Sequence, residues 1–331
     1  MSGFASMKKA ANVVEEEPPE IVVPEQADLP EVTTMTPEAR TGIWGEIKEA
    51  AGNSDHNHTF ILAWGDEGTM KTGCVMDALT EADLKNNGCI LAVDFDGGSA
   101  ACRSAHHRDK LPHIRVLSPW VMSGEGRTTF DYPATHDRVM DIGRAAIEWA
   151  HKQQSSDYKG DRLKWFVVTG LDQWNEVATN CMKIIDLGSA SDGISATVNA
   201  HQLVGNRWNW NIRYTRYHQL SAICTALMTL GVKVYLETHE QVVYENNKET
   251  LNSKPACEKN LVNKVNQIIH FERDEERDDD GSKTGVVNYQ ATFEKSKTNF
   301  NLQGQRRLIG VTRPDAPGVF HGLPELSGDE L

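Results

Sequence analysis

Runs of consecutive apolar residues recur along the middle of the chain and are separated by segments with helical spacing of apolar residues. The clearest runs, 60–64 and 89–93, carry no polar residue, as expected for central strands of a parallel sheet that is covered on both faces. Helices between the runs provide the crossovers that parallel strands need. The pattern therefore predicts an α/β fold with a mostly parallel central sheet flanked by helices. Predicted strands cover 60–64, 89–94, 114–117, 165–168 and 232–236, and predicted helices cover 74–79, 135–152 and 220–230.

The two ends of the chain do not follow this pattern. Residues 1–40 are rich in Pro and Glu and hold few large apolar side chains, which predicts a disordered acidic tail, with a partner-binding arm as the alternative. Residues 313–331 are predicted to form a second acidic tail. One folded domain is therefore expected over 41–312, and the hydrophobic content of 39% suits a globular domain.

A turn signal near the end of this domain predicts a C-terminal β-hairpin. Residues 278–281 read Asp-Asp-Asp-Gly and lie between two strand-like segments, 268–271 and 286–293. The second strand runs into Lys295 and Lys297, whose alternate spacing points both side chains the same way. These lysines are expected either to blunt an exposed edge strand or to stabilise a transferring phosphoryl group, within the subunit or in a neighbouring one.

The first predicted strand leads into a glycine-containing loop and then into a helix, which is the context of a phosphate-binding P-loop. Backbone N–H groups of such a loop surround phosphates. Lys71 is expected to reach the β- and γ-phosphates, and the Thr72 hydroxyl is expected to hold Mg²⁺. An ordinary strand–turn–helix with a surface lysine is the alternative. The predicted nucleotide-binding residues are Gly65, Asp66, Glu67, Gly68, Thr69, Met70, Lys71, Thr72 and Gly73.

Met70 departs from the usual GxxxxGK[ST] pattern, which has Gly directly before the Lys. If the loop keeps its usual geometry, Met70 has to adopt a positive φ, at a cost of about 1–3 kcal/mol. This departure puts the rate of hydrolysis in question more than the fold.

Acidic residues follow two of the predicted strands. Asp94 and Asp96 stand at the end of 89–94, and Asp172 follows 165–168. Ligands of open α/β sheets bind at the carboxyl ends of strands, so these acids can face a γ-phosphate and its Mg²⁺. Thr169 stands where a Walker B acid usually follows the apolar run. Either Asp172 serves as the metal residue instead, or Thr72 and the carboxylates after the preceding strand suffice; a buried strand with a capping Asp172 is the alternative.

Two further stretches suggest how nucleotide binding could be linked to a partner. His239, with Gln241 as second choice, follows the strand 232–236 and is a candidate sensor of the γ-phosphate. Between 206 and 217, arginines alternate with aromatic residues, a composition typical of single-strand nucleic-acid binding, although packing of the aromatics in the core is an equal alternative. The candidate DNA-binding residues are Arg207, Trp208, Trp210, Arg213 and Arg216.

The net charge of −13 does not decide between partners. Acidic residues concentrate in 1–40, 272–280 and 315–331, and the rest of the chain is close to neutral, so the overall charge does not exclude nucleic acid. The six cysteines contain no CxxC pair and are interpreted as small buried hydrophobes in a reducing compartment. With no apolar run long enough to span a membrane and no secretory signal, a cytoplasmic protein is expected, in the host cytoplasm if the chain is viral.

The order of these motifs resembles the RecA-type P-loop ATPase core over roughly residues 55–310. It is most similar to the small RecA-like ATPases of phages and archaeal viruses that assist single-strand annealing and recombination. The resemblance implies that Asp96 activates the attacking water, with Asp94 supporting the strand tip, and that His239 precedes a DNA-binding loop at 242–258. It also implies that Lys295 and Lys297 cap the ATP of a neighbouring subunit.

The sequence therefore predicts an ATPase that binds ATP and Mg²⁺ and acts on single-stranded DNA as a homo-oligomer, in a ring or a filament. Three alternatives remain. A helicase or packaging-type motor could use the same core, and a nucleotide-binding scaffold with little hydrolysis would be consistent with Met70 and Thr169. A small-molecule kinase is disfavoured because no arginine-rich lid follows the P-loop.

Overall fold

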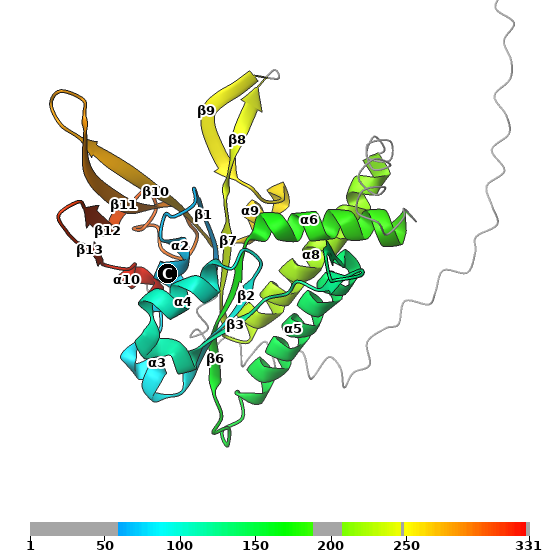
Figure 1. The fold of residues 1–331 in the computed structure, drawn as a ribbon. Helices are drawn as coiled ribbons and strands as arrows, with labels where there is room; N and C mark the ends of the chain where they lie inside the picture. Colours follow the sequence, from blue (N-terminus) through cyan, green and yellow to red (C-terminus); the bar gives the residue numbers. More distant parts are fainter. Residues whose placement is uncertain (1–58, 188–206, 246–247, 329–331) are drawn as a thin grey trace, which may run out of the picture. The chain divides into compact units, whose positions relative to one another are not determined.

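The computed structural model describes residues 59–187, 207–245 and 248–328, and its main feature is a nine-stranded sheet (Figure 1). The strand order is β13-β12-β11-β10-β1-β7-β6-β2-β3, parallel from β10 to β3 and antiparallel from β10 to β13. The predicted α/β class, with a mostly parallel sheet flanked by helices and a C-terminal hairpin, is confirmed. The strands are β1 (Phe60–Gly65), β2 (Gly88–Asp94), β3 (Ile114–Leu117), β6 (Arg162–Thr169), β7 (Lys233–Thr238), β10 (Gln267–Arg277), β11 (Lys283–Ser296), β12 (Arg306–Arg313) and β13 (Ala316–Phe320).

Helices cover both faces of the sheet, which explains why β1 is apolar throughout. Phe60 and Leu62 belong to one buried cluster, which includes residues of α5, α6, α8 and α9, whereas Ile61 and Ala63 belong to a second cluster with residues of α2 and α10. Both faces of β1 are therefore buried, and alternation with polar residues would cost stability. The helices are α2 (Lys71–Asp77), α3 (Glu81–Lys85), α4 (Gly98–His106), α5 (Tyr132–Lys152), α6 (Leu171–Cys181), α8 (Arg207–Thr229), α9 (Lys259–Lys264) and α10 (Pro324–Ser327).

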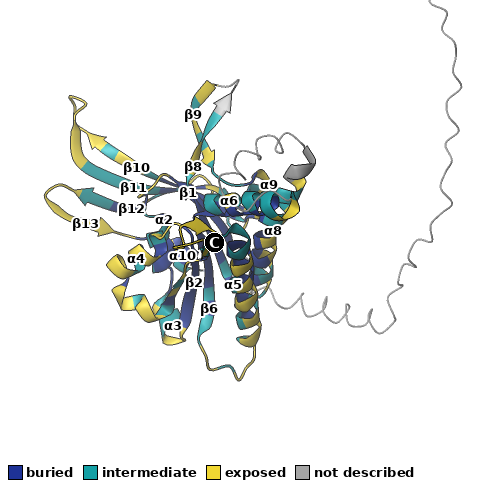
Figure 2. Cartoon of the chain, turned by 45° about the vertical axis from the view of Figure 1, so that its right-hand side comes forward, coloured by how far each residue is buried: buried dark blue, intermediate teal, exposed yellow. Residues whose placement is uncertain are grey.

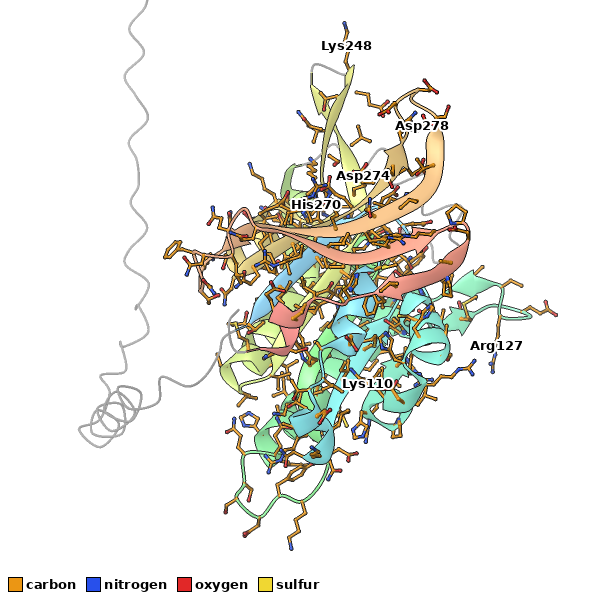
Figure 3. The ribbon with its side chains drawn as sticks, turned by 90° about the vertical axis from the view of Figure 1, so that its left-hand side faces the viewer. Lys110, Arg127, Lys248, His270, Asp274 and Asp278 are labelled. Atoms are coloured by element: carbon orange, nitrogen blue, oxygen red, sulfur yellow. The ribbon has the colours of Figure 1, made fainter. Side chains whose placement is uncertain are left out.

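Two hairpins project beyond the carboxyl edge of the parallel strands. One consists of β8 (Glu240–Glu245) and β9 (Lys248–Pro255) and follows β7 directly; the other is the extended end of β10 and β11 (Figure 1). Lys248 lies near the tip of the first and Asp278 at the turn of the second (Figure 3). Figure 2 shows the turn of the second hairpin as exposed, in contrast to the buried centre of the sheet, and Lys248 of the first is exposed as well. The predicted loop 242–258 is therefore largely a β-hairpin. A further short hairpin joins β4 (Met122–Ser123) to β5 (Thr129–Phe130).

The predicted domain boundary at residue 312 is wrong, because residues up to 328 belong to the folded unit. β13 pairs with β12, and Leu323 and Leu326 are buried in the cluster that includes α2. Arg307 also donates a hydrogen bond to Glu325 at 2.6 Å. The acidic composition of this segment concealed the few apolar side chains that anchor it. The predicted tail at 1–40 lies outside the described residues.

Replacement of Leu326 by Ala tests this correction. Leu326 is fully buried, so Leu326→Ala is expected to lower the free energy of unfolding by about 2–5 kcal/mol. Val319→Ala, at a side chain in β13 that is 52% exposed, is expected to change it by less than about 0.5 kcal/mol. Urea denaturation followed by circular dichroism measures both. Equal, negligible effects would show that the segment is a tail after all.

Within the described ranges, no helix is both long enough and apolar enough to cross a membrane. All six cysteines fall in these ranges and carry free thiols, and Cys74, Cys89, Cys181 and Cys224 are buried. This agrees with their interpretation as small core residues rather than as a disulfide framework.

Candidate functional site

The loop between β1 and α2 depends on close approach of its backbone to β10. Gly65 has φ 148°, and a Cβ at this position would lie 2.0 Å from the carbonyl oxygen of Phe271. Gly68 also has a positive φ of 70°, but a Cβ there would meet nothing within 4 Å. Thr69 donates from Oγ1 to the carbonyl of Asp66 at 2.8 Å and so closes the loop. Gly65 is thus required sterically, whereas Gly68 is required only by its backbone conformation.

This difference predicts unequal effects of two similar substitutions. Gly65→Ala is expected to lower the free energy of unfolding by about 3 kcal/mol or more, because the backbone of β1 or β10 has to move. Gly68→Ala is expected to cost only about 1–2 kcal/mol, the penalty of a left-handed residue with a Cβ. Chemical denaturation of both variants measures the difference. Equal losses would contradict the close packing of Gly65 on Phe271.

Met70 adopts the left-handed conformation that the sequence required of it. Its φ is 66° and its ψ is 12°, directly before the first residue of α2. The side chain packs on β12, where a Cβ on Gly310 would lie 2.8 Å from the Met70 sulfur. The loop therefore keeps a glycine-like backbone at Met70, and the side chain gains a packing partner that offsets part of the strain.

Lys71 is buried inside this loop. Its Nζ donates to the carbonyl oxygens of Gly65 and Asp66, at 2.9 and 2.7 Å, and lies 3.3 Å from the Thr69 hydroxyl. Burial lowers the pKa of the ammonium group, whereas the nearby carboxylates, Glu237 first among them, oppose this shift. The loop therefore holds a cation at its centre through its own carbonyl oxygens, and a phosphate would have to replace these contacts to pair with the ammonium group. The surface-lysine alternative does not agree with this burial.

Thr72 donates its hydroxyl to a carboxylate that the sequence analysis did not select. Oε1 and Oε2 of Glu237 lie 3.0 and 2.8 Å from Thr72 Oγ1. Glu237 is 6% exposed and belongs to the end of β7, the strand next to β1. Burial raises the pKa of Glu237 to about 7, and the charge of Lys71 opposes this. An acid at the end of an apolar strand was the available signal, and it was applied to Asp94 and Asp172 but not here.

The end of β2 carries two acids with different environments. Asp94 is buried and accepts hydrogen bonds from the N–H groups of Gly97 and Ala100, both at 3.0 Å. It therefore holds the turn into α4, in line with the supporting role expected for it. Asp96 is exposed and accepts from the N–H of Gly98 at 2.9 Å. Desolvation and the adjacent Asp94 raise the pKa of Asp96, against the effect of the Gly98 hydrogen bond.

Thr169 occupies the expected Walker B position at the end of β6 and takes no part in the contact with Thr72. Its hydroxyl donates to Asp94 Oδ1 at 2.8 Å and lies 3.3 Å from Asp96 Oδ1. The side chain is fully buried. Thr169 thus ties the strand tips of β6 and β2 together, and the acid beside Thr72 comes from β7 instead.

Asp172, for which a metal role was predicted, pairs with a histidine and not with Thr72. Its carboxylate pairs with Nδ1 of His239, with both oxygens at 3.3 Å. Burial alone would raise the pKa of Asp172, but the hydrogen bond and charge of His239 lower it. The same hydrogen bond raises the pKa of His239. Asp172 therefore orients the imidazole, and the acid in contact with Thr72 is Glu237.

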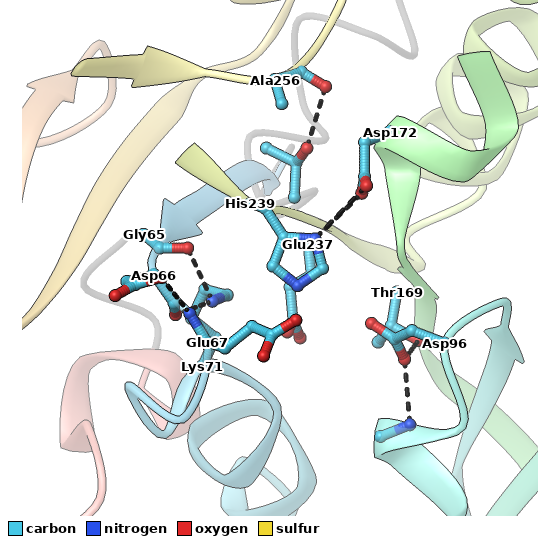
Figure 4. A network of polar contacts seen from close by, with 12 residues as sticks. Gly65, Asp66, Glu67, Lys71, Asp96, Thr169, Asp172, Glu237, His239 and Ala256 are labelled. Atoms are coloured by element: carbon cyan, nitrogen blue, oxygen red, sulfur yellow. Dashed lines mark hydrogen bonds and ion pairs between the residues drawn. The ribbon is translucent and has the colours of Figure 1, made fainter. Parts of the chain in front are cut away.

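Lys71, Glu237, Asp96 and His239 face a common space at the carboxyl edge of the sheet (Figure 4). Among the described residues, no group of three or more His, Cys, Asp or Glu side chains is arranged to hold a metal ion. One threonine hydroxyl with one adjacent carboxylate is nevertheless the kind of partial donor set that suits Mg²⁺, which keeps waters and substrate phosphate oxygens in its shell. The site combines a buried lysine in a glycine-containing loop, a metal-compatible pair and an exposed carboxylate.

The β8–β9 hairpin is attached directly to this site. Thr238 donates from Oγ1 to the carbonyl of Ala256 at 3.0 Å, and the N–H of Ala256 donates to the carbonyl of His239 at 2.9 Å. The end of β7 and the base of the hairpin are therefore one hydrogen-bonded unit. A displacement of His239 would move the base of the hairpin.

Lys295 and Lys297 lie away from the loop of their own chain, which argues against the within-subunit role. Gly65 pairs with Phe271 and Lys295 with Ile268, so Lys295 lies about 10 Å back along the sheet from the loop. The two Nζ atoms donate to the carbonyls of Val262 and Asn263, at 2.6 and 2.9 Å. Both lysines thus point the same way, toward the end of α9.

The arginine and aromatic stretch forms the start of α8 and is used partly for packing. Arg216 forms two hydrogen bonds to Asp186, at 2.6 and 2.8 Å, and its side chain is 17% exposed, which argues against the predicted DNA contact. Tyr217 is buried, as the packing alternative required. Arg213 lies 4.9 Å from the ring centroid of Tyr214. The side chains of Arg207, Trp208 and Trp210 lie outside the described part of the structure.

No family model matches the sequence, and no curated protein matches it. Among solved structures, the chain is similar to the crystal structure of a KaiC-like protein from the hyperthermophilic archaeon Pyrococcus horikoshii. The two share 13% sequence identity, the match covers 75% of this chain and 84% of that chain, and the TM-score is 0.39. The function of the site is therefore inferred from its own geometry.

Proposed function

We propose that this chain is a RecA-like P-loop ATPase that binds Mg-ATP and hydrolyses it to ADP and phosphate. Two neighbouring residues at the end of the glycine-containing loop support the proposal. Lys71 is buried inside the loop, and the Thr72 hydroxyl donates a hydrogen bond to the buried carboxylate of Glu237. A structural strand–turn–helix has no need of a buried lysine and a buried glutamate at its centre, since isolated buried charges are costly.

The donor set fits a magnesium ion held jointly with the nucleotide. Thr72 would hold the ion, and Glu237 would orient the Thr72 hydroxyl or a water in the metal shell. When bound, Mg²⁺ neutralises charge on the β- and γ-phosphate oxygens. Lys71 would supply a second positive charge from within the loop.

Asp96 is the group best placed to accept a proton from the attacking water. The water oxygen bonds to the γ-phosphorus, the bond to the bridging oxygen breaks, and ADP leaves with that oxygen. Asp96 is exposed to the common space, whereas Asp94 is committed to the turn. A raised pKa makes a carboxylate a stronger base, which supports this assignment.

His239 is proposed to sense the γ-phosphate and transmit its presence to the β8–β9 hairpin. Nδ1 is bound to Asp172, which leaves Nε2 for the nucleotide side. The hydrogen bonds between Ala256 and the end of β7 provide the physical connection. Lys295 and Lys297 remain candidates for a site on a neighbouring subunit in a ring or filament.

The proposed effector is single-stranded DNA, in annealing, recombination or repair. The β8–β9 hairpin, whose base adjoins the site, carries exposed Lys254 near that base and exposed Lys248 near its tip, whereas the β10–β11 tip around Asp278 is acidic and would repel phosphates (Figure 3). DNA is therefore expected to follow the first hairpin.

Measurement of ATP turnover with and without single-stranded DNA tests this effector. Stimulation by DNA is expected in the wild type and in Lys85→Ala, a control at an exposed lysine of α3. It is expected to fall in a Lys248→Ala/Lys254→Ala double variant whose basal turnover is unchanged, because contacts to phosphates would be lost. Basal turnover without any response to DNA would reject the effector and leave the ATPase assignment standing.

A nucleotide-binding scaffold with little hydrolysis is the second candidate, because a threonine replaces the usual acid at the end of β6. ATP binding without turnover, under both conditions, would favour it. A helicase or packaging-type motor would instead show translocation along DNA in addition to turnover.

A further inference from the structure

One face of α2 is covered by β12, β13 and the turn that follows them. This face carries Met70, Gly73 and Asp77, which are three and four positions apart and so lie on one side of the helix. A Cβ on Gly310 would lie 2.8 Å from the Met70 sulfur, and one on Gly322 would lie 2.9 Å from Asp77 Oδ2. Thr72, with its contact to Glu237, faces another side of the helix. The phosphates of a nucleotide bound at Thr72 would therefore lie on a different side of α2 from this covered face.

Phe320, the last residue of β13, lies against Gly73 of α2 at the middle of that face. A Cβ on Gly73 would lie 3.7 Å from Cζ and 3.8 Å from Cε2 of the Phe320 ring. The side chain is nevertheless 40% exposed. An aromatic ring is therefore available to a ligand directly beside the end of the phosphate-binding segment.

The ring is held in place from the side of α4. His107, which is 4% exposed, meets Phe320 edge to face, with ring centroids 6.3 Å apart and an interplanar angle of 81°. Cys102 Sγ would lie 3.8 Å from a Cβ on Gly73. Nε2 of His107 is buried and has no hydrogen-bond partner among the described residues. This corner thus combines the flat apolar ring of Phe320 with a histidine nitrogen that forms no hydrogen bond to the described residues.

We propose that the base of the bound nucleotide stacks on Phe320, an inference that rests on the proposed nucleotide function of the loop. A nucleotide held by its phosphates at Lys71 and Thr72 directs its γ-phosphate toward Asp96 and His239, so its nucleoside leaves the loop past Gly73. A base supplies a flat π-face to the Phe320 ring, and its edge carries both donors and acceptors. Because every base has such a face, stacking favours binding without strong selection among bases.

Comparison of ATP with inorganic tripolyphosphate separates this contact from phosphate binding. Phe320→Ala is expected to weaken ATP binding about tenfold, while the affinity for tripolyphosphate changes less than about twofold. Phe320→Trp is expected to retain ATP affinity, since it keeps an aromatic face. Val319→Ala is the matched control, because neighbouring residues of a strand point to opposite faces; it is expected to change neither affinity. Isothermal titration calorimetry in the presence of Mg²⁺ measures all of these.

Two results would overturn the inference without touching the proposed function. In the first, wild type binds both ligands and Phe320→Ala binds ATP unchanged, so Phe320 serves another contact, such as one between subunits. In the second, Phe320→Ala weakens ATP and tripolyphosphate equally, so the ring merely supports the loop. If the wild type binds neither ligand, the proposed function itself fails and the base site fails with it.

Discussion

Glu237→Gln is expected to lower ATP turnover by about 10- to 100-fold, the usual loss when a residue that orients a metal ligand is replaced. Glutamine has the size of glutamate and can still accept the Thr72 hydroxyl, but it lacks the negative charge. Glu240→Gln, three positions further on at an exposed site, is expected to leave turnover unchanged. Steady-state phosphate release at several Mg²⁺ concentrations measures the effect, and excess Mg²⁺ is expected to restore part of the activity.

The same substitution has a distinct signature in stability. The pKa of Glu237 is raised from 4.5 to about 7 in the folded chain, so its ionisation opposes folding as pH rises through this window. Glutamine does not titrate. The free energy of unfolding of Glu237→Gln, relative to wild type, is therefore expected to increase between pH 5 and pH 8 by on the order of 2 kcal/mol. A constant difference across this range would mean that Glu237 is not buried as described, or that the charge of Lys71 cancels the effect of burial on its pKa.

Lys71→Ala is expected to have the largest effect on the nucleotide itself. It removes the only cation within the described loop 65–73, and the affinity for Mg-ATP is expected to fall by about 100-fold or more, since charge-assisted hydrogen bonds to phosphate are lost. Turnover is expected to reach background. Lys164→Ala, at a half-exposed lysine paired with Asp83, controls for loss of charge and is expected to bind ATP normally.

The parallel core could be predicted because its signal is local. Both faces of β1 are buried, so the run Phe60–Trp64 had to be apolar, and the loop after it had to keep Gly65 free of a Cβ. The positive φ of Met70 followed from the same geometry. The sequence signal for these features lies in adjacent residues, although the contacts that require them, such as that of Gly65 with Phe271, join distant parts of the chain.

The parts that sequence analysis missed depend on contacts between distant residues. Thr72 and Glu237 are 165 positions apart, and only the order of strands shows that β7, not β6, lies beside β1. The pairing of Asp172 with His239, 67 positions further along the chain, was likewise not evident from the sequence. The segment 313–328 was assigned to a tail because its acidic composition outweighed Leu323 and Leu326, whose burial becomes evident only against α2.

The most direct test of the central claim is the titration of purified protein with ATP and Mg²⁺, followed by measurement of phosphate release, in wild type and in Lys71→Ala. The structure predicts that the wild type binds ATP and releases phosphate, and that Lys71→Ala, folded by circular dichroism, does neither. Wild-type protein that binds no nucleotide, or equal binding by both proteins, would contradict the assignment of the loop as a nucleotide site.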